Sequence, residues 1–250
     1  MKQVKNYLIT LLGISLLGVG LLVKGSNLTA PPTGTWLPAG TMASPRTGAT
    51  AVLLTNGRVL MTGGTGTTSP LSTAEFLNSD GSFTAAPSMN FARSGHTATV
   101  LQDGRVLVAG GTGATGNATE TAEIFDPSAN TWTAAGPLMV ARSGHTATLL
   151  QSGQVLLAGG SANGAALSSL ELFDPTSNSF TLAGSTLSAA RESHAATVLP
   201  DGRVLIVGGW DGTSGTPVPP ATAGTPNVLA SSDIFDPATG LVSPGPALNI

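Results

Sequence analysis

Three histidines are the residues of this sequence whose type and spacing first suggest chemistry. They are His96, His145 and His194, and each follows the last by 49 residues. Three imidazoles can bind zinc when they converge on one ion at bonding distances of about 2 Å. This spacing, however, places each histidine at the same position of a repeated segment, and the fourth equivalent position is Ala49. We therefore expect a hydrogen bond between repeats at each histidine, and no metal.

The arginines repeat in the same way, which argues against a catalytic role. A catalytic arginine would be singular, whereas every arginine of this chain occupies a position shared by several segments. The first position holds Arg46, Arg93, Arg142 and Arg191, and the second holds Arg58, Arg105 and Arg203, with Gln154 as its fourth member. The first set is predicted to pair with backbone carbonyl groups or with the recurrent acids, which are Glu75, Glu123, Glu171 and Asp233.

Glu192, Trp210 and Asp211 depart from the repeated pattern, and they are the candidate binding residues. Trp210 and Asp211 begin a loop rich in Pro, Gly and Thr, residues 210–230, that lengthens the fourth repeat. From the second glycine of each pair to the next phenylalanine there are 12, 14 and 13 residues in the first three repeats but 26 in the fourth. The three side chains and the loop are expected to share one surface. The alternative is an idle insertion, which a surface loop tolerates.

No set of residues outside the repeats predicts catalysis. The chain has no Cys, so it has no thiolate metal site, no disulfide and no cysteine nucleophile. No Ser-His-Asp set and no pair of carboxylates stands out from the repeats. We therefore predict no catalytic residue, no bound metal and no cofactor.

Pairs of glycines mark the repeated element that must position these side chains. The pairs lie 47, 49 and 49 residues apart, and the first set of arginines keeps the same steps. They are Gly63 and Gly64, Gly110 and Gly111, Gly159 and Gly160, and Gly208 and Gly209. Such a period indicates an array of similar units, and the glycines are expected to let neighbouring strands or units approach closely.

Each repeat reads as four short strands. A segment such as "HTATVL" and an apolar one such as "RVLVAGG" flank an Asn-Gly, Asp-Gly or Ser-Gly pair, which predicts a hairpin with a two-residue type I′ turn. The second strand is apolar at almost every position, so both of its faces are expected to be covered. A third strand, which ends in Asp-Pro in three repeats, and a fourth strand complete a four-stranded antiparallel sheet.

Sheets of four strands that repeat near 50 residues, with Gly-Gly after four apolar residues and two aromatic residues seven apart, resemble the kelch repeat. The aromatic pairs are Phe76 and Phe83, Phe125 and Trp132, and Phe173 and Phe180, with Phe235 and Val242 in the last repeat. The resemblance covers residues 36–250. The repeats are also similar to those of secreted bacterial kelch proteins related to the central domain of galactose oxidase.

This resemblance implies an all-β fold, a kelch-type β-propeller with four complete four-stranded blades plus one leading strand. The copper chemistry of galactose oxidase is not expected, because it requires a cofactor made from Tyr and Cys. The chain has no Cys, and its one tyrosine is Tyr7.

The predicted units divide the chain into a leading strand and four blades. The leading strand falls in 31–45, and the blades are 46–92, 93–141, 142–190 and 191–250. A lone strand around Trp36 cannot make a fifth blade, so the ring is expected to be incomplete. Either the chain is part of a longer propeller or a second copy completes it, because two exposed apolar blade faces would invite self-association.

Residues 1–30 read as an export signal. Lys2 and Lys5 precede an apolar run at 7–23, which is the layout of a secretory signal peptide, with an uncleaved membrane anchor as the alternative. Beyond this leader seven Arg face thirteen Asp and Glu, a formal charge of −6, so a nucleic-acid partner is not expected. The sequence predicts a secreted, periplasmic or cell-surface protein.

Taken as a function, this pattern predicts noncovalent binding of a protein or a cell-surface glycan through loops on one face. The alternative is a carbohydrate-active enzyme domain, or a fragment of one, whose catalytic residues lie outside this chain. A binding module would change its thermal stability with ligand and show no turnover, which distinguishes the two.

Overall fold

The structure is a computed structural model that describes residues 39–214 and 226–248. The predicted leader at 1–30 and the expected strand around Trp36 lie outside the described residues. The described residues are all β-strand, turn and irregular chain, with no helix among them. Accordingly, no helix long and apolar enough to cross a membrane is found in these two ranges.

Four antiparallel sheets of four strands follow one another along the chain, and we call them blades 1 to 4. Blade 1 contains β1 (Thr50–Leu53), β2 (Val59–Thr62), β3 (Ala74–Leu77) and β4 (Phe83–Ala86). Blade 2 contains β6 (Thr97–Val100), β7 (Val106–Ala109), β9 (Ala122–Asp126) and β10 (Thr131–Ala134). Blade 3 contains β11 (Thr146–Leu149), β12 (Val155–Ala158), β15 (Ser169–Asp174) and β16 (Ser179–Thr186). Blade 4 contains β17 (Ala195–Val198), β18 (Val204–Val207), β21 (Ser232–Asp236) and β22 (Leu241–Pro244).

The second strand of each blade is the centre of the core, as its continuous apolar run predicts. All four residues of β7 are buried, and so are all four of β12. Alternate side chains of such a strand point to opposite faces, so one strand serves two junctions. Val155 and Leu157 pack toward blade 2, whereas Leu156 and Ala158 pack toward blade 4. Burying both faces in this way removes the apolar sheet surfaces from water, the main favourable contribution to folding.

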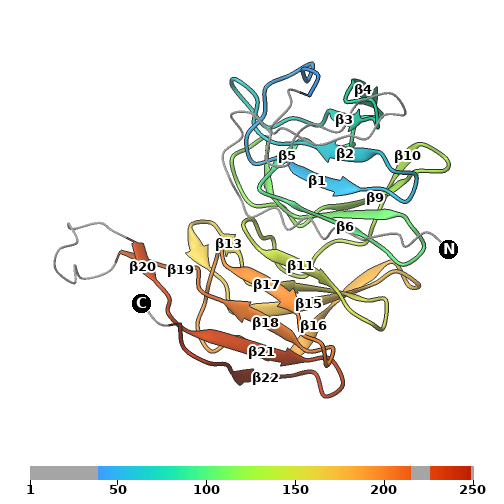
Figure 1. The fold of residues 1–250 in the computed structure, drawn as a ribbon. Helices are drawn as coiled ribbons and strands as arrows, with labels where there is room; N and C mark the ends of the chain where they lie inside the picture. The colour runs from blue at the N-terminus through green and yellow to red at the C-terminus, as the bar shows by residue number, and fades with distance from the viewer. Residues whose placement is uncertain (1–38, 215–225, 249–250) are drawn as a thin grey trace, which may run out of the picture.

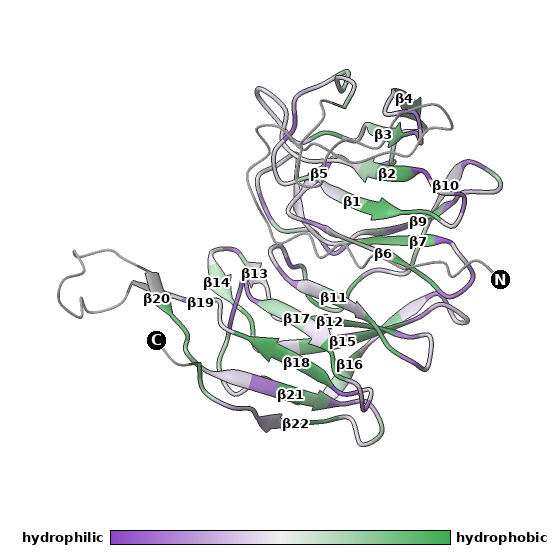
Figure 2. Cartoon of the chain, viewed as in Figure 1, coloured by the Kyte–Doolittle hydropathy of each residue, from purple (hydrophilic) through white to green (hydrophobic). Residues whose placement is uncertain are grey.

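The blades form an open arc in chain order. Their innermost strands contact one another in the sequence β1, β6, β11 and β17. Figure 1 shows blade 1 and blade 4 at opposite ends of this arc, with the other two blades between them. Colouring by hydropathy shows green in the second strands of the blades, among them β2, β7 and β18, with paler outer strands and turns (Figure 2).

The turn between the first two strands of each blade differs from the predicted type I′ turn. In blade 1 Gly57 has a φ of +82°, whereas Asn56 does not have a positive φ. The N–H of Gly57 donates to the Leu54 carbonyl oxygen (3.0 Å) and that of Leu54 donates to the Arg58 carbonyl oxygen (2.8 Å), which makes a three-residue loop. The side chain of Asn56 accepts a hydrogen bond from the Arg58 N–H (3.1 Å). The same backbone bonds recur at Gly104, Gly153 and Gly202.

The two aromatic residues of blade 1 do not lie opposite each other, unlike those of blade 2. Phe83 lies opposite Leu77 in the β3–β4 ladder, whereas Trp132 lies opposite Phe125 in blade 2. Phe83 follows Glu75 by eight residues, whereas Trp132 follows Glu123 by nine, so Phe76 takes the position of Ile124 and faces the next blade. There its ring packs against Phe125 of the next blade, with centroids 6.0 Å apart.

Three small two-stranded sheets accompany blades 2 to 4, two of them formed within the connection from the second to the third strand and one by that connection and the segment that enters blade 2. They are formed by β5 (Arg93–Ser94) with β8 (Thr112–Gly113), by β13 (Ser161–Ala162) with β14 (Ala165–Ala166), and by β19 (Trp210–Ser214) with β20 (Pro226–Val228). The segment 210–230, predicted as a long loop, therefore contains two paired strands, because β19 at its start pairs with β20 near its end. We call the surface that carries these small sheets the loop face.

Candidate functional site

Each arginine of the first set is buried in the segment that enters a blade. Arg142, in the segment that leads into blade 3, donates through Nη1 to the carbonyl oxygens of Gly159 (2.7 Å) and Ser169 (3.1 Å). Its Nη2 donates to the Ser169 hydroxyl (3.1 Å) and to the carboxylate of Glu171 (2.6 Å). Burial lowers the pKa of Arg142, and the Glu171 charge opposes that shift. Carbonyl and carboxylate contacts, both expected from the sequence, thus occur on one side chain.

The carboxylate of Glu171 holds the segment between blades as well as the arginine. It accepts hydrogen bonds from the backbone N–H groups of Met139 (2.8 Å) and Val140 (3.0 Å). A buried charge that is paired and also hydrogen-bonded avoids most of its desolvation cost. The same arginine–acid pair occurs in every blade, as Arg46 with Glu75, Arg93 with Glu123 and Arg191 with Asp233.

The glycine pairs make room for this segment. At Gly110 an added Cβ would meet the carbonyl oxygen of Arg142 and lie 2.9 Å from Cε1 of His145, and the residue has a φ of +61°. At Gly111 it would lie 2.7 Å from the carbonyl oxygen of Ser94. Gly111 also donates its N–H to the Arg142 carbonyl oxygen (2.8 Å). The pair therefore lets the backbone of one blade touch the segment entering the next.

The histidines join blades through threonine hydroxyls. Nε2 of His145 lies 2.9 Å from Oγ1 of Thr97, which belongs to the preceding blade. Burial and the nearby Arg93 charge lower the pKa of His96 to about 3, and burial and Arg191 lower that of His194 to about 4. The pKa of His145 is also lowered well below its usual value, chiefly by burial. All three rings are therefore neutral at pH 7.

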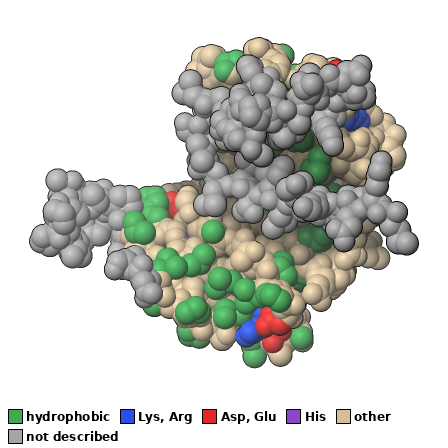
Figure 3. All heavy atoms as spheres, viewed as in Figure 1, with side chains coloured by type: hydrophobic (Ala, Val, Ile, Leu, Met, Phe, Trp, Pro, Cys, Tyr) green, Lys and Arg blue, Asp and Glu red, His purple; other side chains and the backbone are tan. Residues whose placement is uncertain are grey.

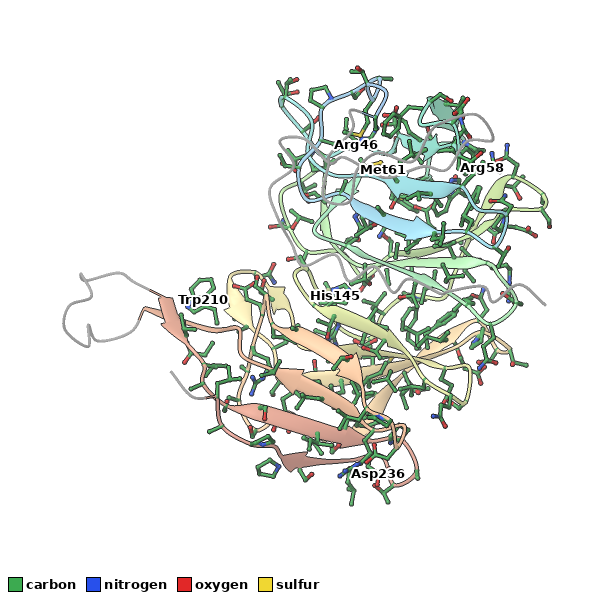
Figure 4. All side chains as sticks on the ribbon, viewed as in Figure 1. Arg46, Arg58, Met61, His145, Trp210 and Asp236 are labelled. Atoms are coloured by element: carbon green, nitrogen blue, oxygen red, sulfur yellow. The ribbon has the colours of Figure 1, made fainter. Side chains whose placement is uncertain are left out.

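The three histidines do not converge on one point. Each ring occupies its own junction and hydrogen-bonds its own threonine, and Figure 4 shows His145 between blades, well away from Trp210. Within the described ranges no cluster of three or more His, Asp or Glu side chains could hold a metal ion. These residues build the junctions between blades.

A polar pocket opens on the loop face between blades 2 and 3. Its volume is about 320 Å³. It is lined by Thr112, Gly116, Asn117, Ala118, Ser143, Ser161, Asn163 and Gly164. The two sides come from the β8 turn and the β13–β14 hairpin, and the backbone bridge between Ser143 and Ser161 forms part of the wall. No charged side chain lines it, so its chemistry is that of hydroxyl and amide groups.

The side-chain polar groups of this pocket are free of hydrogen bonds to the described part of the protein. Among the described residues, the hydroxyls of Thr112, Ser143 and Ser161 and the amides of Asn117 and Asn163 make no side-chain hydrogen bond. The arrangement therefore presents several donors and acceptors to a ligand in one concave place.

Glu192 and Trp210 lie beside each other on the same face. Their backbones exchange two hydrogen bonds, of 2.9 and 3.0 Å, at the position where Ser143 pairs with Ser161 in the preceding blade. Oε2 of Glu192 lies 3.7 Å from the place that a Cβ on Gly144 would take, next to Ser143 of the pocket wall. The structure thus brings Glu192 to the edge of the pocket.

Trp210 and Asp211 lie in β19, which packs against the other wall of the pocket. A Cβ at Gly212 would lie 2.9 Å from the backbone nitrogen of Ala166 in β14, so the two small sheets touch. Figure 1 shows β19 and β20 projecting on the same side of the arc as β13. Both Trp210 and Asp211 make further interactions with the protein.

Comparison with known proteins agrees with this architecture. Residues 92–139, which are nearly all of blade 2, match the Kelch motif. Blade 2 thus carries a Kelch motif. No curated protein sequence matches the chain.

Solved structures share the fold at low sequence identity. The structure of YjhT has a TM-score of 0.69 and 15% identity, over 86% of this chain and 74% of that one. A fungal alcohol oxidase of the AA5 family, solved in complex with copper, has a TM-score of 0.52 and 17% identity over 86% of this chain. The chain spans 56% of the length of that oxidase.

The residues of this chain do not fit the copper chemistry of galactose oxidase. That chemistry requires a cysteine crosslinked to a tyrosine, and the chain has no Cys and no tyrosine after Tyr7. The histidines are each engaged by a threonine in separate junctions. No step of copper chemistry can be assigned to the described residues.

The pocket was missed because its residues look ordinary in sequence. What identifies these residues is their position in the repeat. In each blade, the residue after the glycine pair forms a backbone bridge with the residue after the arginine of the first set. Both positions hold Ser or Thr in blades 1 to 3, and they hold Trp210 and Glu192 in blade 4. At these positions the loop face thus carries hydroxyl groups in blades 1 to 3 and the two larger side chains in blade 4.

Proposed function

We propose that this protein is an exported kelch-type propeller that binds a protein or a cell-surface glycan noncovalently through its loop face. The observation that carries the proposal is the pocket of about 320 Å³, whose hydroxyl and amide groups are not engaged by the described part of the protein. Loops held by a rigid sheet scaffold are common places for binding residues.

The chemistry of the pocket favours a neutral polar ligand. Hydroxyl and amide groups match the donors and acceptors of a sugar or of an exposed peptide backbone. Glu192 at the pocket edge adds an acceptor for sugar hydroxyl groups. An anionic ligand is disfavoured, because the chain after the leader has a formal charge of −6 and no lysine.

The binding test uses a glycan array with the purified protein, followed by titration of any hit. We expect the double variant Ser143→Ala with Ser161→Ala to weaken binding about tenfold or more, since each lost hydrogen bond in a site contributes about 0.5–1.5 kcal/mol. The matched control is Thr47→Ala with Thr65→Ala, the same two repeat positions in blade 1, outside the pocket. Equal losses in both variants would contradict the assignment of the site.

Glu192 distinguishes binding from catalysis. As a binding residue, Glu192→Gln weakens the ligand-induced rise in melting temperature, and the protein leaves the ligand chemically unchanged. Turnover of a glycan that is lost in Glu192→Ala would instead favour the carbohydrate-active enzyme. Mass analysis of the ligand after prolonged incubation separates the two outcomes.

Export is part of the proposal and rests on the Lys-flanked apolar run at 7–23. A reporter enzyme fused after Ala30 is expected outside the cytoplasmic membrane. Recovery of the reporter with membranes would favour an anchor over a cleaved signal, and retention in the cytosol would refute export.

A further inference from the structure

Ser193 has a backbone conformation that a serine side chain disfavours. Its φ is +53°, and the equivalent residues of the other three blades are glycines, Gly48, Gly95 and Gly144, each with a φ of +62°. Every other described residue that has a positive φ and is not glycine is an asparagine, which tolerates this conformation. Backbone strain of this kind gathers at functional sites. Ser193 therefore indicates a use for its side chain.

Glu192, the residue before Ser193, departs from the repeats at the same place. The other blades have a small hydroxyl residue there, which is Thr47, Ser94 or Ser143. The backbone around the two residues keeps its usual bonds, since the Ser193 N–H donates to the Gly144 carbonyl oxygen (2.9 Å) as the Gly144 N–H does to that of Gly95 (3.0 Å). Blade 4 thus differs in the side chains that it presents, and not in how its entry segment is held.

The side chains of Glu192 and Ser193 lie around one point. Oε2 of Glu192 and Oγ of Ser193 are each 3.7 Å from the place that a Cβ on Gly144 would take. Gly144 directly follows Ser143, which lines the polar pocket. A carboxylate oxygen and a hydroxyl oxygen therefore flank the space over Gly144, at the edge of that pocket.

Neither side chain is engaged by the described part of the protein. Within that part Glu192 forms no ion pair, and neither the Glu192 carboxylate nor the Ser193 hydroxyl makes a hydrogen bond. Glu192 is half-buried and Ser193 is exposed. The described surface seen in Figure 3 is mostly uncharged, with few Lys or Arg side chains on it. The carboxylate is thus available to a cationic group of a ligand.

The chemistry of this pair favours a primary ammonium group. An ammonium group has three donors and no acceptor, whereas a carboxylate and a hydroxyl both accept hydrogen bonds. Hydrogen bonds between an ammonium and a carboxylate are about twice as strong as those between neutral groups. The formal charge of −6 after the leader also attracts cations to the surface.

We propose that Glu192 and Ser193 bind the protonated amine of an amino sugar whose ring occupies the adjoining pocket. The hydroxyls of Ser143 and Ser161 bind hydroxyl groups of the ring, which is neutral like the pocket, and the charge lies at the pocket edge. This inference rests on the proposed function, which it narrows to glycans with free amino groups.

The first test compares two ligands that differ in charge at one group. A short glucosamine oligomer and an N-acetylglucosamine oligomer of the same length are titrated by calorimetry in weakly acidic buffer, in which the free amine is protonated. We expect the glucosamine oligomer to bind at least about tenfold more tightly, and the preference to shrink as salt is added. Equal affinity would overturn the amine site and leave the proposed function standing. Binding of neither oligomer would also overturn it, whereas a glycan-array hit of another class would still support the proposed function.

The second test removes the charge at one position. Glu192→Gln keeps the shape of the side chain and is expected to abolish the preference for the glucosamine oligomer. Glu120→Gln is the matched control, because Glu120 is an exposed carboxylate in the connection between β8 and β9 that does not line the pocket, and this variant keeps the preference. Equal losses in both variants would assign the preference to net charge and overturn the site.

Ser193→Gly separates the backbone from the side chain. Glycine relieves the strain at this φ, so the melting temperature is expected to rise, while binding of the glucosamine oligomer weakens several-fold because a hydroxyl acceptor is lost. Unchanged affinity would overturn the role of Ser193. A lysine tripeptide that binds with the same dependence on Glu192 would overturn the sugar as the ligand.

Discussion

The buried arginine–carboxylate pairs are the residues on which the stability of each blade depends most. In Arg142→Met, the carboxylate of Glu171 stays buried without its charged partner. We expect the free energy of unfolding to fall by about 3–5 kcal/mol, because an uncompensated buried charge is left behind. Urea denaturation followed by circular dichroism measures this loss.

The control for this prediction is a surface pair of the same chemistry. Arg105 pairs with Asp103 at 2.7 Å, but the two side chains are 35% and 48% exposed. Arg105→Met should cost less than about 1 kcal/mol, since exposed ion pairs contribute little. Similar losses in Arg105→Met and Arg142→Met would contradict the role given to burial.

The histidines make stability depend on pH below neutrality. In the folded protein the pKa of His96 is about 3 and that of His194 about 4, whereas both titrate near 6.5 in the unfolded chain. Above pH 6.5 neither state is protonated, so stability is unaffected there. As pH falls below 6.5 only the unfolded chain takes up protons, so stability falls and levels off once the folded pKa is passed.

The size of this effect can be measured between pH 7 and pH 5. Each buried histidine is expected to cost about 2 kcal/mol at pH 5, from the protonation of the unfolded chain alone. His145→Gln removes one titrating group and should reduce the loss between the two pH values by about a third. A loss of equal size in that variant would show that other groups govern the pH dependence.

At the scale of elements, the close approach of a strand end to the next segment explains the glycine pairs. In Gly110→Val the side chain would meet the Arg142 carbonyl oxygen and the His145 ring, at a φ that valine disfavours. We expect the melting temperature to fall by at least about 10 °C, whereas Asp211→Ala leaves the domain folded. Equal melting temperatures in a thermal scan would refute this explanation.

Strands were predictable from the sequence because their pattern is local, whereas turn geometry was not. The apolar run of β12 identifies a strand buried on both faces, and burial of Leu156 and Leu157 on opposite faces confirms it. Asp103-Gly104 allows a type I′ turn, but the bond from the Arg105 N–H to Asp103 Oδ1 favours another turn, with a positive φ at glycine alone.

The candidate site was predictable only in part, because it depends on contacts between repeats. Glu192 and Trp210 stand out in sequence because they are large residues where other repeats have Ser or Thr. Ser143 and Ser161 do not stand out. They belong to the pocket only because Ser143, in the segment that enters blade 3, bridges Ser161, which follows the second strand of the same blade. Periodicity identifies the repeats but does not reveal which turns of two repeats enclose a space.

At the scale of the whole molecule, stability should be highest in the middle of the arc. Blades 2 and 3 are packed on both faces, whereas no described strand covers one face of blade 4. We expect amide hydrogens of β18 to exchange several-fold faster than those of β12. Hydrogen exchange with mass spectrometry measures this difference. Equal exchange rates in β18 and β12 would contradict this difference in packing.

The arginine–carboxylate pairs also bear on how such a chain can change in evolution. Each pair lies within one segment that runs from one arginine of the first set to the next, as Arg93 and Glu123 do in residues 93–141. Duplication or deletion of one such segment in the gene therefore adds or removes the arginine and its carboxylate together. No buried charge is left without its partner. The number of blades can therefore differ between related proteins, while every arginine keeps its electrostatic partner.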